Sequence, residues 1–314
     1  MNVPWLQPHE QQLNESLTHD RLGHAPLILG PAGLGKRKLA RWLTARILCL
    51  SPSAGQPCGN CRSCTLLASG THPDLFIAAI PEDKTQLTVD VIRALTQGLQ
   101  LTPSMGPTRV GLVEEADQMN ENAANALLKT LEEPSSQAWL VLVSDDPDSL
   151  PPTVLSRCQK IPVHPPQPED TRTWLQGQAT NVTEADIALA LDAAGGAPLR
   201  AQALLTENGL EFGREVRRVL LESARGQLPT PAMLEAWSIR PLETWQWLSH
   251  WIRQFMGSAL MPGDAELDFI NPVALSELWQ QALQGRAMAR TSIRTDLLLG
   301  KWLLEWSALF DRQS

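Results

Sequence analysis

The sequence lacks any long hydrophobic run, and this absence excludes proteins that cross a membrane by helices. No stretch of the 314 residues approaches the roughly 18 unbroken apolar residues that span a bilayer. The first residues, MNVPWLQPHEQQL, also lack the basic-then-apolar pattern of a secretory signal. We therefore expect a cytoplasmic protein with no membrane partner.

Positive charge is scarce as well. The 26 Lys and Arg residues are outnumbered by 34 Asp and Glu residues, which gives a net charge of −8. A protein that holds nucleic acid by itself usually shows a basic excess or a basic stripe, and neither is visible. If DNA matters to this chain, we expect other subunits to supply most of the phosphate contacts.

Cysteine is rare but clustered, since four of the five cysteines occur within sixteen residues. In a reducing compartment such clustering favours metal binding over disulfides. Four thiolates satisfy a tetrahedral Zn²⁺ and leave no open position, so the predicted site is structural. An iron–sulfur cluster is the alternative, but the fourth cysteine precedes the Cys-x₂-Cys-x₂-Cys run and no Cys-Pro follows it. The predicted ligands are Cys49, Cys58, Cys61 and Cys64.

Two further residues bear on this cluster. His72 is a possible fifth ligand, although we expect it to be a local turn residue. Cys158 lies far from the cluster in sequence and is expected to be a small buried side chain.

The first half of the chain alternates between short apolar runs and helical patterns. The runs cover 27–29, 75–80, 110–113, 139–143 and the surroundings of Ile161, and the helical patterns cover 36–48, 89–101 and 122–131. This alternation predicts an α/β fold, with a parallel sheet covered by helices on both faces.

The proline-rich segment 162–168 (PVHPPQP) predicts a domain boundary, because four prolines prevent helix continuation. Strand signals then largely cease, and residues 208–314 are mostly amphipathic helix. Trp247 and Trp251, like Trp302 and Trp306, are spaced i,i+4 and share a helix face. We expect these pairs to pack in a core; a subunit-packing face is the alternative.

A phosphate-binding loop follows the first apolar run. Residues 30–36 satisfy the pattern G-x-x-x-x-G-K, with Gly30, Gly33 and Gly35 allowing backbone N–H groups to face a phosphate. Lys36 would neutralise phosphate charge. The eighth position, normally Ser or Thr, is Arg37, which offers no oxygen to Mg²⁺ and would repel it.

We therefore expect no Mg²⁺ at this loop and no independent ATP hydrolysis, while ATP binding stays open. The alternative is that Arg37 swings outward and water replaces the missing hydroxyl. Glu114 and Glu115 follow the strand at 110–113, in the manner of a Walker B motif. Active P-loop ATPases normally have Asp at the first of these positions, so Glu114 is a second indication that the chain does not hydrolyse ATP. Glu115 stands where the base that activates water would be.

Two segments carry a family resemblance. Residues 125–134 (NALLKTLEEP) and 156–158 (SRC) resemble bacterial clamp-loader AAA+ subunits, within which the delta-prime family of DNA polymerase III is the nearest. Residues 70–74 (GTHPD), the cysteine cluster and residues 295–299 (TDLLL) support the resemblance. Delta-prime subunits commonly have degenerate nucleotide sites, and Arg37 fits that branch.

The resemblance implies three domains. They are a RecA-like AAA+ base at 1–164 with a zinc module inserted at 49–64, a helical lid at 165–207 and an all-α collar at 208–314.

The resemblance also implies site residues. Arg157 matches the arginine finger that reaches a neighbouring subunit's ATP, a role suited to a planar, always-charged fork. The alternative is an arginine at a helix end, paired with a local carboxylate. Ser144 and Arg200 occupy the positions of sensor residues.

The function implied is that of a non-hydrolysing clamp-loader subunit of the DNA polymerase III holoenzyme. The complete holoenzyme, and not this subunit alone, is a nucleotidyltransferase. Its partners would be the gamma/tau ATPase subunits, the clamp-opening delta subunit and, indirectly, the sliding clamp and primed DNA. An active AAA+ ATPase, alone or as a subunit of a clamp loader or homo-oligomer, is the first alternative. A DNA-binding protein with a zinc module is the second, and the acidic net charge disfavours it.

Overall fold

The chain folds into two compact units, Met1–Gln167 and Pro168–Ser314. The structure is a computed structural model that describes residues 3–310 except 82–83, 179–181, 260–271 and 290–293. The division between the units falls in the proline-rich segment. The finer separation of a lid at 165–207 from a collar at 208–314 stays a prediction.

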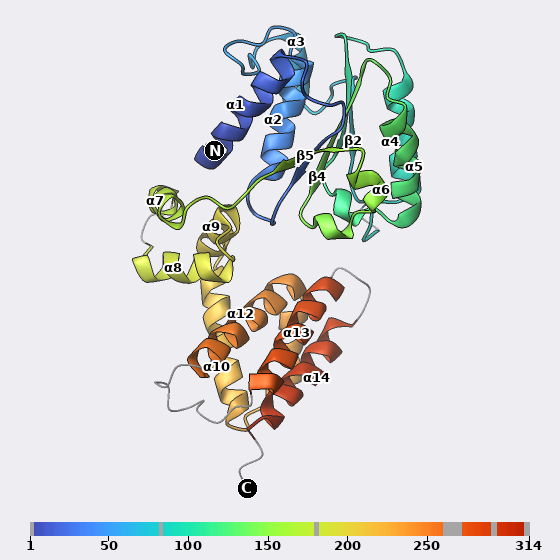
Figure 1. Cartoon of the computed structure of the whole chain (residues 1–314). Helices are drawn as coiled ribbons and strands as arrows, with labels where there is room; N and C mark the ends of the chain where they lie inside the picture. The colour runs from blue at the N-terminus through green and yellow to red at the C-terminus, as the bar shows by residue number, and fades with distance from the viewer. Residues whose placement is uncertain (1–2, 82–83, 179–181, 260–271, 290–293, 311–314) are drawn as a thin grey trace. The chain divides into compact units, whose positions relative to one another are not determined.

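A five-stranded sheet forms the centre of the first unit (Figure 1). The strand order is β2-β3-β4-β1-β5, and every neighbouring pair is parallel. Every residue of β3 is buried, as expected for a strand covered on both faces. The predicted parallel sheet is confirmed. The strands are β1 Pro26–Leu29, β2 Leu75–Ala78, β3 Arg109–Val113, β4 Ala138–Ser144 and β5 Gln159–Pro162.

Helices cover both faces of this sheet. Figure 1 shows α1 and α2 on one face and α4 and α5 on the other. Helix α4 buries Ile92, Leu95 and Leu99 against the sheet, where they join the main apolar core. The helices of the unit are α1 Gln7–Thr18, α2 Lys36–Leu48, α3 Arg62–Ala68, α4 Val89–Gln100, α5 Glu121–Glu132 and α6 Pro152–Leu155. Three short 3₁₀ helices are Pro4–Leu6, Ala116–Gln118 and Pro147–Ser149.

The second unit is helical throughout the part of it that the structure describes. A turn through Gly195 and Gly196, both with positive φ, separates α8 from α9. The helices are α7 Pro168–Gln178, α8 Glu184–Ala193, α9 Pro198–Thr206, α10 Gly209–Ala224, α11 Pro231–Ser238, α12 Pro241–Ala259, α13 Pro272–Met288 and α14 Thr295–Ala308.

Tryptophans fill the core of the second unit. The rings of Trp247 and Trp251 stack at a centroid distance of 5.9 Å, and those of Trp302 and Trp306 at 6.5 Å. All four are buried within the unit, so the prediction of core packing for both pairs is confirmed. The Trp306 indole N–H also donates to the Leu220 carbonyl at 2.8 Å, which satisfies a polar group that the core would otherwise leave unpaired.

Over the described residues, no helix has both the length and the apolar character needed to cross a bilayer.

Candidate nucleotide and metal sites

Three parallel strands bring the predicted nucleotide residues of the first unit to one edge of the sheet. Strands β1, β3 and β4 are neighbours, and their carboxyl ends are followed by Gly30, Glu114 and Asp145. Leu29 lies opposite Ser144 in the β1–β4 register. The carboxyl edge of a parallel sheet is where ligands of such folds bind.

The loop between β1 and α2 has the backbone of a phosphate cradle. Gly30, Gly33 and Gly35 have φ values of 144°, 85° and 89°, a region that favours glycine. A Cβ on Gly30 would lie 2.2 Å from the Val163 carbonyl oxygen, so no larger residue fits there. Helix α2 begins directly after Gly35, with its N-terminus toward the loop.

Lys36 does not extend into open solvent. Its side chain is 2% exposed, and its Nζ donates to the Pro31 carbonyl at 2.7 Å and lies 2.5 Å from Asp145 Oδ1. Asp145 was not predicted from the sequence, although it directly follows the sensor candidate Ser144. The ammonium that would meet a phosphate is thus held by a carboxylate of the same chain.

Arg37 forms an ion pair with the second acid that follows β3. Its Nη2 lies 2.5 Å from Oε1 of Glu115, the residue at the position of a water-activating base. The two side chains are 49% and 26% exposed, so the pair faces solvent.

Arg41 forms a second ion pair, with Glu114. Its Nε and Nη2 donate to the two carboxylate oxygens of Glu114, at 2.5 and 3.0 Å. The hydrogen bonds and the charge of Glu114 raise the pKa of Arg41. Arg41 was not predicted from the sequence; the signal was its position one helical turn after Arg37 on α2. Both acids of the Walker B-like motif are therefore bonded to guanidinium groups.

The two sensor candidates differ in their surroundings. Ser144 is fully buried at the end of β4, and among the described residues its hydroxyl has no hydrogen-bond partner. Arg200 belongs to the second unit, where its guanidinium donates to Gln246 Oε1.

Arg157 follows helix α6 and is 36% exposed. Its Nη1 donates to the Thr153 carbonyl at 2.9 Å, and its Nη2 lies 2.6 Å from Glu132 Oε1 at the end of α5. Cys158 is only partly buried, and burial raises the pKa of its thiol to about 11.

The four clustered cysteines meet at one point. Their sulfur atoms all lie within 4.8 Å of one another, with Cys49 3.6 Å from Cys58 and 3.9 Å from Cys61. Sulfurs bonded to a tetrahedral zinc at about 2.3 Å would be about 3.8 Å apart. A disulfide needs about 2.05 Å, so the cysteines are free thiols. The cluster can hold a metal ion, and its spacing fits zinc.

Backbone N–H groups prepare two of these sulfurs for the thiolate form. Donation from Asn60 and Cys61 lowers the pKa of Cys58. Burial opposes the same effect at Cys61, yet donation from Cys64 and Leu50 lowers its pKa to about 6. Burial instead raises the pKa of Cys64, to about 12. Bonds from N–H groups are typical of a turn that wraps around a metal.

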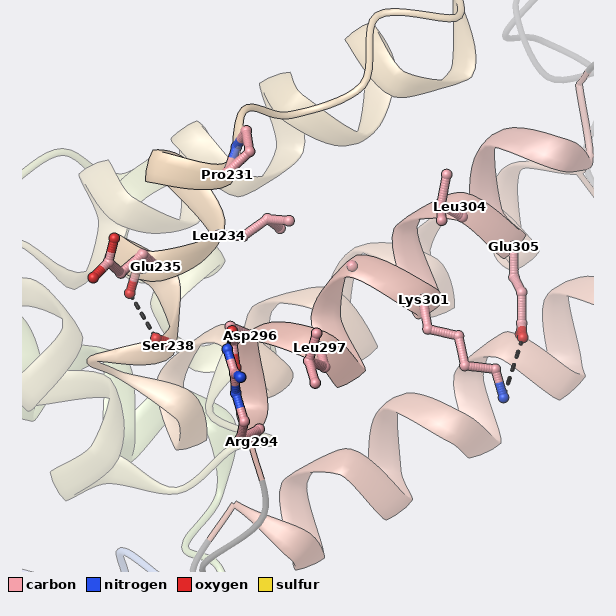
Figure 2. A pocket seen from close by; sticks show the side chains of 11 residues that line it. Pro231, Leu234, Glu235, Ser238, Arg294, Asp296, Leu297, Lys301, Leu304 and Glu305 are labelled. Atoms are coloured by element: carbon pink, nitrogen blue, oxygen red, sulfur yellow. Dashed lines mark hydrogen bonds and ion pairs between the residues drawn. The ribbon is translucent and has the colours of Figure 1, made fainter.

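A separate groove lies in the second unit, between α11 and α14. It has a volume of about 880 Å³. Figure 2 shows Leu234 on one side and Leu297 and Leu304 on the other, with an ion pair between Lys301 and Glu305. Leu297 and Leu304 are 61% and 56% exposed. Exposed leucines in a groove mark a surface suited to protein contact.

Comparisons with known proteins place these features in context. A family model described as "DNA polymerase III, delta subunit" matches residues 6–167. The DNA polymerase III subunit delta' of Pseudomonas aeruginosa is 32% identical over an alignment of 322 positions, which covers 98% of this chain and 97% of that protein. The DNA polymerase III subunit tau/gamma of Haemophilus influenzae is 37% identical over 147 residues, or 46% of this chain and 21% of that protein.

A solved structure is similar over nearly the whole chain. It is a DNA polymerase III gamma subunit-related protein from Thermotoga maritima, 17% identical, covering 97% of this chain and 99% of that one with a TM-score of 0.50. At this identity the similarity concerns the fold, which is the expected RecA-like AAA+ sheet domain followed by helices.

Proposed function

This chain belongs to the delta-prime subunit family of DNA polymerase III, and from that premise we propose that it serves the clamp loader without hydrolysing ATP itself. It would be a fixed member of the complex that loads the sliding clamp on primed DNA. It would also complete the ATP site of a neighbouring gamma/tau subunit. A cytoplasmic location is part of the same proposal.

One observation carries the absence of hydrolysis. Glu114 and Glu115, which would hold Mg²⁺ and activate water, are bonded to Arg41 and Arg37 of helix α2. A Mg²⁺ ion would have to displace two guanidinium groups and then sit beside them. Solvent-exposed ion pairs contribute only about 0.2–1 kcal/mol each, so the main obstacle is the repulsion between Mg²⁺ and the two guanidinium groups beside it.

Nucleotide turnover by the purified chain tests the proposal. We expect no Mg²⁺-dependent ATP hydrolysis above background. Turnover that disappears in Lys36→Ala would overturn the proposal in favour of an active ATPase.

A gain-of-binding variant tests the physical reason. Arg37→Thr restores the hydroxyl of the loop, and Arg41→Ala releases Glu114. We expect the double variant to bind ATP about tenfold more tightly with Mg²⁺ than without it, a difference of about 1.4 kcal/mol. Arg46→Ala is the matched control on the same helix, since Arg46 donates to Asn14 away from the acids. A double variant that ignores Mg²⁺ would refute the role of the ion pairs.

Arg157 is the residue we propose for the neighbour's site. Its guanidinium is partly exposed and already oriented by Thr153 and Glu132. Arginine fingers contribute about 10³–10⁵ in rate by stabilising charge on the transferred phosphoryl group. The chain would thereby contribute a catalytic residue to the ATP site of the neighbouring subunit.

The partners follow from the same family membership. We propose contacts with gamma/tau and delta subunits through the helical second unit, where the groove of Leu297 and Leu304 offers apolar surface. The net charge of −8 fits a subunit that reaches clamp and DNA through others.

For the cysteine cluster we propose a structural zinc ion. Cys49, Cys58, Cys61 and Cys64 would supply all four ligands, so no position remains for substrate or water. The ion would fix the loop between α2 and α3 and contribute folding free energy there.

A further inference from the structure

A buried pair of polar side chains lies beside the cysteine cluster. Ser63 is fully buried and His72 is 7% exposed. The Ser63 hydroxyl donates to the Leu48 carbonyl at 2.7 Å, and its oxygen lies 2.9 Å from His72 Nε2. On the other side of the ring, the Asp74 backbone N–H donates to His72 Nδ1 at 3.1 Å.

These contacts assign the protons of the pair. Nδ1 accepts from Asp74, so it carries no hydrogen. The single hydroxyl hydrogen of Ser63 is used on Leu48, so Nε2 of His72 must be the donor to Ser63. The ring is a neutral imidazole, in keeping with the burial that lowers the pKa of His72.

This proton arrangement excludes one function for a Ser–His pair. A nucleophilic serine must give its hydrogen to the histidine, whereas here the histidine donates to the serine. The pair is also closed to solvent. Its purpose is therefore structural.

The position of the pair shows what it holds together. Leu48 is the last residue of α2 and directly precedes Cys49, whereas Ser63 lies between Cys61 and Cys64 in the first turn of α3. The hydroxyl thus joins the backbone of the isolated first cysteine to the segment that carries the last two.

The far end of this chain of bonds is firmly anchored. The Asp74 carboxylate is fully buried and accepts from the backbone N–H groups of Ser104 and Met105, at 2.7 and 2.9 Å. Arg109 Nε lies 3.5 Å from the same carboxylate. His72 is consequently held from a segment outside the cysteine loop.

We propose that Ser63 and His72 are positioning residues of the metal site, which hold Cys49 within reach of the other three sulfurs. The inference rests on the proposed zinc site. Neither residue touches the ion: Ser63 fixes the Leu48 carbonyl, and His72 fixes the Ser63 hydroxyl. Outer-shell contacts of this kind typically change metal affinity by about 10–100-fold.

Metal affinity of the full-length chain tests the proposal. The protein is stripped of metal and titrated with Zn²⁺ in competition with a chromophoric chelator, and Co²⁺ absorption reports the coordination geometry. We expect Ser63→Ala and His72→Leu to weaken Zn²⁺ binding by about 10–100-fold. His72→Gln keeps an N–H donor near the Nε2 position and should restore most of the affinity.

Thr65→Ala is the matched control. Its hydroxyl also lies beside the cluster, donating to the Cys61 carbonyl at 3.2 Å, but it does not reach Leu48. We expect its Zn²⁺ affinity to stay within about threefold of the unmodified chain, since an exposed hydrogen bond that does not reach Leu48 contributes little to the position of Cys49.

The outcomes separate the two levels of inference. If the unmodified chain binds no stoichiometric Zn²⁺, or if Cys61→Ser binds it equally well, the zinc proposal itself fails. If the chain binds Zn²⁺ and Ser63→Ala matches it in affinity and Co²⁺ spectrum, the positioning role is refuted. If Ser63→Ala or His72→Leu stays unfolded even in excess Zn²⁺, the positioning role is also refuted, because the pair would then serve packing alone.

Discussion

Arg157 has two interpretations, and its contacts make them separable. The 2.6 Å pair with Glu132 is what a purely local helix-end arginine would show, yet the guanidinium is exposed enough to meet a second anion. If the arginine acts only locally, removing Glu132 should harm the complex as much as removing Arg157. If it acts on a neighbour's ATP, only the loss of Arg157 should matter.

We therefore predict that Arg157→Ala slows the DNA-stimulated ATPase of the reconstituted clamp loader by at least about tenfold, toward the range known for arginine fingers. Folding of the isolated chain should be unchanged. Arg157→Lys should rescue little, because lysine lacks the planar fork.

Two controls frame this measurement. Glu132→Gln should keep most of the rate, and an equal loss in it would favour the local interpretation. Arg93→Ala removes a comparable exposed arginine, paired only at 3.9 Å with Asp90, and should have no effect.

At the scale of single elements, close packing of tryptophan against helix backbone is the feature most open to test. A Cβ on Gly213 of α10 would lie 2.4 Å from the Trp247 ring. Substitution by alanine forces the ring or the helix to move. Overpacking of this kind costs about 1–3 kcal/mol.

We predict that Gly213→Ala lowers the free energy of unfolding by about 1–3 kcal/mol in urea titrations. Gly257→Ala is the matched control on α12, because a Cβ there meets nothing within 4 Å. Alanine should stabilise that helix by up to about 1 kcal/mol. Equal effects of the two substitutions would show that packing against Trp247 does not decide the result.

A histidine of α12, His250, lies beside Asp192 of α8 and makes the stability of the second unit depend on pH. Burial lowers the pKa of His250 to about 4; Asp192 opposes this shift and Arg253 adds to it. The unfolded chain takes up a proton near pH 6.5, whereas the folded chain resists it until about pH 4. Stability is therefore complete above pH 6.5 and is lost as the pH falls toward 4.

We predict that unfolding at pH 5 costs about 2 kcal/mol less than at pH 7 through this residue, from about 1.5 pH units at 1.36 kcal/mol each. Urea titrations at the two pH values measure it. His250→Gln should be less stable at pH 7 but should lose about 2 kcal/mol less on acidification. An unchanged pH dependence in this variant would assign the effect to other groups.

The sequence predicts secondary-structure elements and motifs better than it predicts which side chains contact each other. Apolar runs were sufficient to predict the parallel sheet, glycine spacing to predict the loop at residues 30–36, and cysteine spacing to predict the metal cluster. The partners of the basic residues were not predictable, since Arg37 and Glu115 are 78 residues apart and Arg41 and Glu114 are 73 apart. Such pairs exist only once α2 packs against β3, which ends directly before the two acids. The Ser63–His72 contact was not predictable either, because its structural role depends on its burial and on the bond from Ser63 to the Leu48 carbonyl.

At the scale of the whole molecule, charge sets the relation to DNA. A chain with a net charge of −8 has no electrostatic reason to concentrate phosphate at its surface. We predict that the isolated chain binds primed DNA no more tightly than weak non-specific binders, with Kd above about 10⁻⁵ M at physiological salt.

Fluorescence anisotropy with labelled primed DNA checks this prediction. Tight binding with a steep salt dependence would favour a DNA-binding zinc module instead. Co-purification from the native cell supplies the positive test, in which recovery with gamma/tau and delta subunits is expected.

The tryptophan core also determines how this molecule can be observed. The chain contains no tyrosine, and eight of its eleven tryptophans lie in residues 168–314. Its intrinsic ultraviolet emission therefore arises almost entirely from indole, since the five phenylalanines emit weakly, and most of these indoles lie in the second unit. A shift of that emission to longer wavelength reports water reaching Trp237, Trp245, Trp247 and Trp306. The chain thus carries its own optical probe for the unit proposed to meet its partners.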